Sequence, residues 1–290
     1  MKRLIAFALV YIIWGSTYLA IRYAILTIPP FIMAGVRFVI AGAILYGLGM
    51  IRGEKKPTGR QWRNTVIIGV ALLLGGNGAV TWAEQMVPSG ITALLVAVVP
   101  MWLVLFDWIR PHGNRPSWGV LLGVVIGFAG VVELVGIHTF QGNGNIAPIG
   151  VAVLMIGSML WAGGSLFAKA ADLPSPVRTT AMEMLVGGVA LLIAGAVTGE
   201  FSHWSPHTVS LTSVMGLIYL ITFGSLVAYT AYTWLVQNAS PAAVGTYAYV
   251  NPVVAIILGW LVAHEPVTKE TIIGATVIIA AVTIITTAKR

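Results

Sequence analysis

Long apolar stretches alternate with short polar segments along the whole 290-residue chain. A stretch of about 18 apolar residues with few charges is long enough for an α-helix to cross the hydrocarbon core of a bilayer. The polar segments are too short for a soluble domain. We predict an all-α polytopic membrane protein with ten transmembrane helices, at residues 4–24, 30–51, 64–84, 89–109, 117–137, 147–169, 176–198, 210–235, 241–263 and 270–288.

The composition supports this class. Hydrophobic residues make up 58% of the chain and charged residues only 9%, whereas soluble domains carry about 25% charged residues. The chain has no cysteine, which excludes disulfides and thiolate metal sites. The start, "MKRLIAFALVYIIWGS", resembles a signal peptide, but further apolar segments follow it directly. We therefore expect it to remain as the first helix.

The distribution of lysine and arginine predicts the orientation. If the N-terminus is cytoplasmic, thirteen of these residues fall on the cytoplasmic side and only Arg22 and Lys269 on the other. This bias is the usual one in membrane proteins. We expect both termini in the cytoplasm and a location in the cytoplasmic (inner) membrane of a bacterium. The basic segment "RGEKKPTGRQWR" is interpreted as a topology signal beside lipid headgroups, and no nucleic-acid partner is predicted.

An internal repeat divides the chain. "WGSTYLAIR" begins at Trp14 and "WAGGSLFAK" at Trp161, and in the following helices Arg37 aligns with Glu183. Each copy holds five helices, an odd number, so the second copy must cross the membrane in the opposite sense. Inverted repeats are typical of transporters. The two inverted five-helix repeats are predicted at residues 1–140 and 146–290.

The tryptophans of the repeat suggest a cavity. Trp14 and Trp161 fall near the middle of their helices beside small residues such as Ser16. An indole N–H at that depth needs a partner, so it should face protein or a watery cavity. Close packing of small residues between helices is the alternative.

Interrupted helices point to the same region. Pro100 and Pro252 each remove a helix hydrogen bond, and paired interrupted segments mark binding sites in repeat-built transporters. We expect a cavity lined by the first, third, fourth, sixth, eighth and ninth helices, although any one residue could instead be core or interface. The further substrate-binding candidates are Asn77, Trp82, Met101, Tyr229, Tyr249 and Asn251.

Arg37 and Glu183 are the charges that lie well inside the apolar stretches. Charges within a membrane are costly and often functional. Both are candidates for a coupling or gating role, and Glu183 could carry a proton. A structural hydrogen bond for Glu183, or a loop-pinning role for Arg37, is the alternative.

Other patterns limit the function. The spacing of Gly119, Gly123 and Gly127 favours close helix packing, within a monomer or, as an alternative, a dimer. The histidines have no metal-site spacing, and we find no hydrolase motif and no nucleotide-binding loop. We therefore predict no enzyme, no cofactor and no metal.

Several motifs resemble those of a known family. They are "WGSTYLAIR", "RFVIAG", "GGNGAVTWAEQMVPSGITALLVAVVP" and "YAYVNPVVAIILGWLVAHEPVTKETIIGATVIIAAV", and the resemblance covers essentially the whole chain. The chain resembles the ten-helix EamA branch of the drug/metabolite transporter superfamily. It departs from the pattern at "FDWIRPHGNRP", which lacks a counterpart of Glu265. The resemblance implies export of metabolites, amino acids or drugs.

Taken with the repeat, this resemblance predicts a secondary transporter that exports a small-molecule substrate, an amino acid (aromatic ones included) or a drug-like solute, by alternating access. An uncoupled facilitator or channel, or a lipid-scrambling protein, is the alternative.

Overall fold

The computed structural model describes residues 2–111, 113, 115–135, 147–239 and 246–287. Every regular element in these ranges is a helix. Nine helices of the described residues are long and apolar enough to span a membrane, and Tyr247–Ala263 is a shorter apolar helix at the ninth of ten positions. The prediction of an all-α polytopic membrane protein is confirmed.

The first half of the chain forms five spans, three of which combine consecutive helices. Their elements are α1 (Lys2–Leu9), η1 (Val10–Trp14) and α2 (Gly15–Ala24); α3 (Pro30–Ile51); α4 (Gly59–Gly69), η2 (Val70–Asn77) and α5 (Gly78–Ala83); α6 (Ser89–Val96) and α7 (Val99–Ile109); and α8 (Trp118–Val135).

The second half repeats this order, with two short helices before its third span. Its elements are α10 (Pro148–Ala170); α11 (Pro176–Val197); α12 (Glu200–His203) and η3 (Pro206–Thr208); α13 (Leu211–Tyr219), η4 (Leu220–Val227) and α14 (Ala228–Asn238); α16 (Tyr247–Ala263); and α17 (Lys269–Thr287). The elements η1, η2 and η4 are π-helical, and η2 and η4 occupy matching places in the third and eighth spans.

Local sequence explains where several helices begin. A proline stands in the first turn of α3, α10 and α11, where its missing N–H costs nothing. Thr58 and Gln61 form a reciprocal capping box at the start of α4. This cap extends the third span five residues beyond its predicted start at residue 64.

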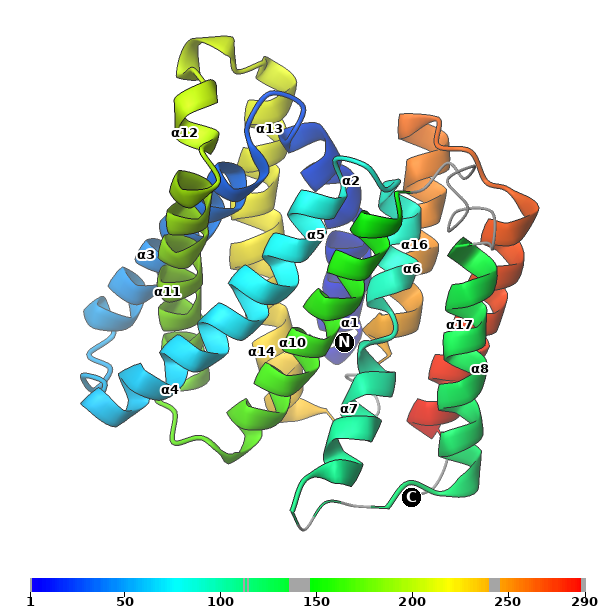
Figure 1. Ribbon diagram of the computed structural model, residues 1–290. Coiled ribbons are helices and arrows are strands. Elements are labelled where there is room, and N and C mark those ends of the chain that lie inside the picture. Colours follow the sequence, from blue (N-terminus) through cyan, green and yellow to red (C-terminus); the bar gives the residue numbers. More distant parts are fainter. Residues whose placement is uncertain (1, 112, 114, 136–146, 240–245, 288–290) are drawn as a thin grey trace.

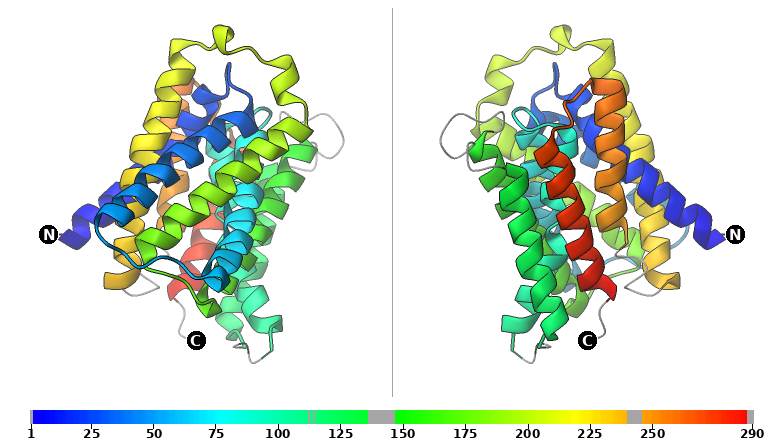
Figure 2. Two further views of the ribbon diagram at one scale, coloured as in Figure 1. Left: turned by 90° about the vertical axis from the view of Figure 1, so that its left-hand side faces the viewer. Right: turned by 90° about the vertical axis from the view of Figure 1, so that its right-hand side faces the viewer.

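The helices form one bundle in which α3 and α11 lie at one side and α8 and α17 at the other (Figure 1). We name the end that carries α12 and the α16–α17 turn the upper end, after its place in Figure 1, and the opposite end the lower end. The N-terminal part of α1 extends away from the bundle (Figure 2).

The contact between α3 and α11 is reciprocal. A Cβ atom at Gly42 would lie 2.9 Å from the carbonyl oxygen of Ala181, and one at Gly188 would lie 3.0 Å from that of Gly35. The register that aligns Arg37 with Glu183 also aligns Gly42 with Gly188 and Gly35 with Ala181. The contact of Gly42 with Ala181 therefore maps onto the contact of Gly188 with Gly35. A two-fold axis between the two antiparallel helices produces this equivalence, so the packing supports the inverted repeat.

The fifth and tenth spans pack together in the same antiparallel manner. Gly123 of α8 faces Ile285 of α17, and Gly274 of α17 faces Leu134 of α8. A side chain at Gly123 would overlap Ile285, which explains the small residues of α8. Gly123 and Gly127 are therefore in contact with other helices of this chain, whereas a Cβ at Gly119 would meet nothing within 4 Å.

Candidate functional site

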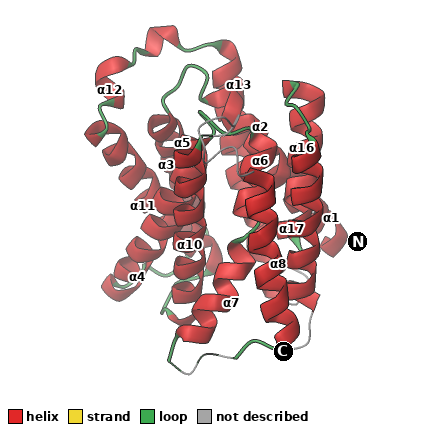
Figure 3. Ribbon diagram, turned by 45° about the vertical axis from the view of Figure 1, so that its right-hand side comes forward, coloured by secondary structure: helices red, strands yellow, loops and turns green. Residues whose placement is uncertain are grey.

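A cavity lies in the middle of the bundle. The space open to the centre of a water molecule is about 120 Å³. Its lining comes from the first, third, fourth, sixth, eighth and ninth spans, as expected, and also from α3, which the sequence analysis did not include. Both halves of the chain therefore contribute to one site, and Figure 3 shows how their helices are arranged in the bundle.

An aromatic cluster forms one wall. The Trp14 ring lies 4.9 to 5.5 Å, between ring centroids, from the rings of Tyr232, Tyr229 and Tyr247. Trp14, Tyr229 and Tyr247 line the cavity. The indole Nε1 of Trp14 donates a hydrogen bond of 3.2 Å to the carbonyl oxygen of Gly224 in η4. The indole is thus anchored at one edge while its ring contributes to the wall.

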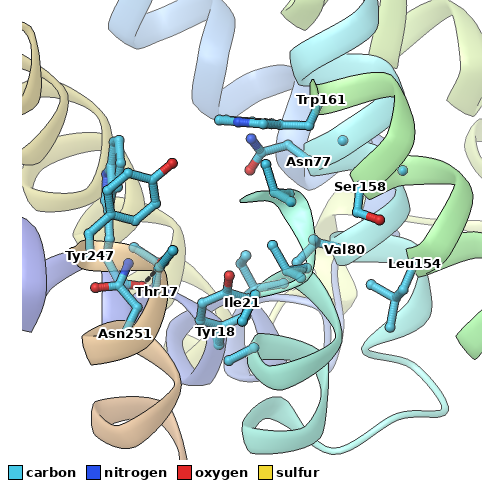
Figure 4. Close-up of a pocket in the computed structure, with 18 of the residues that line it drawn as sticks. Thr17, Tyr18, Ile21, Asn77, Val80, Leu154, Ser158, Trp161, Tyr247 and Asn251 are labelled. Carbon is cyan, nitrogen blue, oxygen red and sulfur yellow. Dashed lines mark hydrogen bonds between the residues drawn. The ribbon is translucent and has the colours of Figure 1, made fainter. Parts of the chain in front are cut away.

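The opposite wall carries Trp161, Asn77 and Ser158, which face Tyr247 and Asn251 across the cavity (Figure 4). The Trp161 ring lies directly against the backbone of η2, because a Cβ at Gly76 would come within 2.6 Å of it. This close approach gives the glycines around Asn77 a packing role. The cavity therefore has aromatic side chains on both walls.

Asn251 brings an unpaired polar atom to the cavity. Its side chain is 6% exposed, and its Oδ1 has no hydrogen-bond partner among the described residues. Unpaired buried acceptors are uncommon because they lose the hydrogen bonds that they make with water. In a cavity wall, such an atom can accept a hydrogen bond from a ligand.

Arg37 is the charged residue that lines the cavity, and it is 5% exposed. Its Nε donates to the Ser225 hydroxyl at 3.0 Å, and its guanidinium lies 4.7 Å from the Phe38 ring centroid. Within the described residues, no acidic side chain forms an ion pair with it. The side chain is therefore held in place while its charge stays uncompensated by a carboxylate in direct contact.

Glu183 does not line the cavity. It is 7% exposed and packs where α11 crosses α4, with its carbonyl oxygen 2.9 Å from the position of a Cβ at Gly69. Tyr229, a cavity residue, interacts electrostatically with both Glu183 and Arg37. The two membrane charges therefore share a neighbour, although only Arg37 reaches the cavity.

Four sequence candidates lie away from the cavity wall. The Ser16 hydroxyl bonds to the Ile13 carbonyl oxygen and the Tyr219 hydroxyl, Met101 is fully buried beside Gly127, and Trp82 and Tyr249 pack on the apolar core. The reason is helical phase. Cavity residues recur every three or four positions. Trp82 and Met101 each stand two positions from a cavity residue, and Ser16 and Tyr249 each stand next to one, so all four side chains point away from the cavity.

The same periodicity would have found residues that the sequence analysis missed. Thr17, Tyr18 and Ile21 follow Trp14 at helical spacing and line the cavity, as does Ser158, which precedes Trp161 by three positions. Phe38 stands next to Arg37, but the remaining residues of this part of α3 are apolar, so no polar or aromatic pattern at helical spacing marks Phe38 itself.

Glu265 joins three spans at the upper end. It accepts hydrogen bonds from the Ser89 amide and hydroxyl, both at 2.9 Å, and from the Gly90 amide at 3.2 Å. The Arg22 Nε lies 3.5 Å from the same carboxylate. The carboxylate thus caps the N-terminus of α6, where the helix dipole favours a negative charge.

The sequence explains how Glu265 reaches α6. His264 ends α16 with a left-handed backbone (φ 53°), and the Glu265 amide turns back to donate to the Gly259 carbonyl oxygen. A Cβ at Gly259 would lie 2.5 Å from the Glu265 carboxylate, so glycine leaves the space for it.

Glu84 is a buried carboxylate that the sequence analysis missed. It follows the third span, is 2% exposed, and neither of its carboxyl oxygens has a hydrogen-bond partner among the described residues. Burial raises the pKa of Glu84 well above its ordinary value of 4.5, Glu265 raises it further, and Arg22 opposes the shift. Burial therefore favours the neutral form of this carboxyl, which interacts electrostatically with Tyr18, a residue that lines the cavity.

The described residues contain no group of three or more His, Cys, Asp or Glu side chains that could hold a metal ion. The polar groups that face the cavity are amide, hydroxyl, phenol, indole and guanidinium groups. Such groups can bind a solute through hydrogen bonds and charge.

Several known proteins are similar in sequence to this chain. The EamA-like transporter family matches residues 1–136 and 148–287. The inner membrane transporter YedA of Escherichia coli is 42% identical over 280 residues, which cover 96% of this chain and 89% of YedA. Protein PecM of Dickeya dadantii is 24% identical over 94% of this chain and 88% of its own length.

A solved crystal structure has the same fold. It superposes with a TM-score of 0.67 at 20% identity and covers 98% of this chain and 95% of the other chain. The family match spans nearly all of the sequence, and the relatives align over almost their full length. The chain is a membrane transporter of the EamA-like transporter family.

Proposed function

We propose that the protein exports a small amphipathic metabolite across the cytoplasmic membrane by alternating access. The central cavity carries this proposal, because it lies within the bundle and both halves of the chain line it. Aromatic rings on both walls suit a solute with an apolar body, and the amides and the guanidinium suit its polar groups.

The arrangement of the two halves supports alternating access. Two similar halves of opposite orientation can exchange their packing and open the cavity first to one side and then to the other. The exchanged contacts between α3 and α11 agree with this relationship. Glu265 joins the end of α16 to the start of α6 at the upper end of the bundle, and in this proposal separation of the two opens the cavity toward that end.

The lower end carries the basic loops between α3 and α4 and between α7 and α8, so the positive-inside bias assigns it to the cytoplasm. We propose that both termini are cytoplasmic and that one copy of the chain suffices for transport. A reporter that is active only in the periplasm, fused after Arg290, should stay silent. Periplasmic activity would contradict the orientation.

The second candidate is an uncoupled facilitator. Among the described residues that line the cavity there is no carboxylate, so substrate and a coupling proton do not share an obvious site there. A facilitator would need only the solute gradient. The proton-coupled exporter requires a carboxylate outside the wall, for which Glu183 is the candidate.

Counterflow in proteoliposomes tests the proposal. Vesicles loaded with unlabelled solute should accumulate a labelled trace of the same solute, and the initial rate should saturate with concentration. Trp161→Ala should reduce this rate, whereas Trp260→Ala, at an exposed position on α16, should leave it unchanged. Flux that rises linearly with concentration, without counterflow, would indicate a channel.

A further inference from the structure

Arg37 places a permanent positive charge in the wall of the cavity. A guanidinium keeps its proton in proteins, so burial cannot neutralise it. Removing such a charge from water is costly unless a nearby anion compensates it. Within the described residues, no carboxylate lines the cavity, and none pairs with Arg37. The missing anion can come from the substrate.

The guanidinium is oriented for such an anion. Its Nε is engaged by Ser225, and Phe38 packs against its plane. Its two terminal nitrogens make no hydrogen bond with the residues that the structure describes, and one of them lies beside Gly224, which also contacts Thr17 of the cavity. Two terminal nitrogens held in one plane match the two oxygens of a carboxylate.

Asn251 supplies an independent observation. Its buried Oδ1 lacks a donor, and Figure 4 shows Asn251 beside Thr17 in the cavity wall. A substrate N–H or O–H would satisfy this oxygen. The site therefore combines a donor pair for an anion with an acceptor for a neighbouring amino or hydroxyl group.

The aromatic wall offers a surface for the apolar part of the substrate. Trp14 and Tyr247 line the cavity on the side of Asn251, so the body of the substrate would lie on aromatic rings. A simple amine would bring a second positive charge to a wall that has no acid to compensate it. The arrangement thus favours anions over cations.

We propose that the cavity binds amphipathic organic carboxylates, with Arg37 binding the carboxylate and Asn251 accepting a hydrogen bond from an amino or hydroxyl group beside it. This assignment rests on the proposed transport function and names the substrate class of the same cavity. Arg37 would otherwise serve only to join α3 to η4.

Four matched probes test the assignment on the purified, detergent-solubilised protein by calorimetric titration. Phenyllactate carries the carboxylate and the hydroxyl donor, phenyllactamide lacks the charge, phenylpropionate lacks the donor, and phenethylamine is a cation. Phenyllactate should bind roughly 10-fold to 100-fold more tightly than the amide, and roughly 2-fold to 10-fold more tightly than phenylpropionate. The amine should bind most weakly.

Variants assign each preference to its residue. Arg37→Gln should remove the preference for phenyllactate over its amide, and Arg37→Lys should retain part of it, because a single ammonium keeps the charge but loses the paired donors. Asn251→Leu should make phenyllactate and phenylpropionate equal. Arg63→Gln, which removes an exposed positive charge in α4, should change none of these ratios.

The outcomes separate the substrate class from the transport function. Equal binding of acid and amide by the unmodified protein, preference for the amine, or no binding of any probe would overturn the assignment, even if Arg37→Gln failed to fold. Counterflow of the amide or the amine without the acid would leave transport intact and refute the anion site. Saturable counterflow of phenyllactate, lost in Arg37→Gln, would support both.

Discussion

At the scale of single residues, the buried charges show what a sequence can reveal. Arg37 and Glu183 stand out because each interrupts an apolar stretch. Glu84 does not, because it stands at the last position of the predicted third span (64–84), where charged residues are common, although it is 2% exposed. Glu84 interacts electrostatically with Tyr18, Arg22 and Glu265, which lie in distant segments of the chain, and no local pattern can predict this environment.

Glu84 should make the stability of the protein depend on pH. Its pKa is raised in the folded protein above the ordinary value of 4.5, so its contribution is complete below that value and is lost as pH rises through the folded pKa. We expect the melting temperature to fall as the pH rises above about 5. Glu84→Gln should flatten this dependence and cost little stability at the lower pH.

Glu265→Gln gives a comparison. This substitution removes the charge that faces Arg22 and one of the oxygens that receive bonds from Ser89 and Gly90, so it should destabilise the protein by about 1–3 kcal/mol. Because Glu265 also raises the pKa of Glu84, the substitution should weaken the pH dependence without abolishing it. An unchanged pH slope in Glu84→Gln would show that Glu84 is not the buried neutral acid.

Glu183→Gln distinguishes proton coupling from facilitated transport. If Glu183 carries the coupling proton, the substitution should abolish export driven by a proton gradient. Counterflow should continue, because exchange moves no net proton and Glu183 lies outside the cavity wall. Gradient-driven export that persists in the variant would exclude the coupling role, and a parallel loss of both activities and of thermal stability would indicate a structural one.

At the scale of elements, the apolar runs predicted the first and last residues of some spans correctly. The ranges 30–51 and 89–109 coincide with α3 and with the span of α6 and α7, because a proline or a loop bounds each run. The start of the ninth span, predicted at residue 241, falls on residues 241–245, outside the described part of the chain. The π-helical segments were not predicted, because a wider turn depends on packing against neighbouring helices.

Glu200 should stabilise the start of α3. Its carboxylate accepts hydrogen bonds from the amides of Phe31 and Ile32, at 3.1 and 2.9 Å. Gly199, with φ of 78°, turns the chain toward α3 after α11 ends. Glu200→Ala should lower the free energy of unfolding by about 1 kcal/mol, measured as the denaturant midpoint. Glu133→Ala, an exposed acid on α8, should have no effect, and equal effects would rule out a specific cap.

At the scale of the whole molecule, the repeat in the sequence explains contacts that no single helix predicts. The α3–α11 crossing exchanges its glycine contacts, and Gly53 and Gly199 both adopt positive φ at equivalent places in the two halves. The two halves resemble each other more closely in their packing than in residue identity, because the helix crossing requires only small residues at the points of contact. The division at residues 140 and 146 stays a prediction, since both positions lie outside the described residues.

Alternating access predicts that the upper end must open during transport. Ser89 belongs to the first half and Glu265 to the second, and the hydroxyl of one lies 2.9 Å from the carboxylate of the other. The chain contains no cysteine, so Ser89→Cys with Glu265→Cys gives a unique pair for a short reducible thiol crosslinker. Crosslinking should stop counterflow and reduction should restore it. The crosslinker should not change the counterflow rate of either single variant. Full counterflow through the crosslinked protein would show that the upper end does not move, and the solute would then have to leave the cavity by another route.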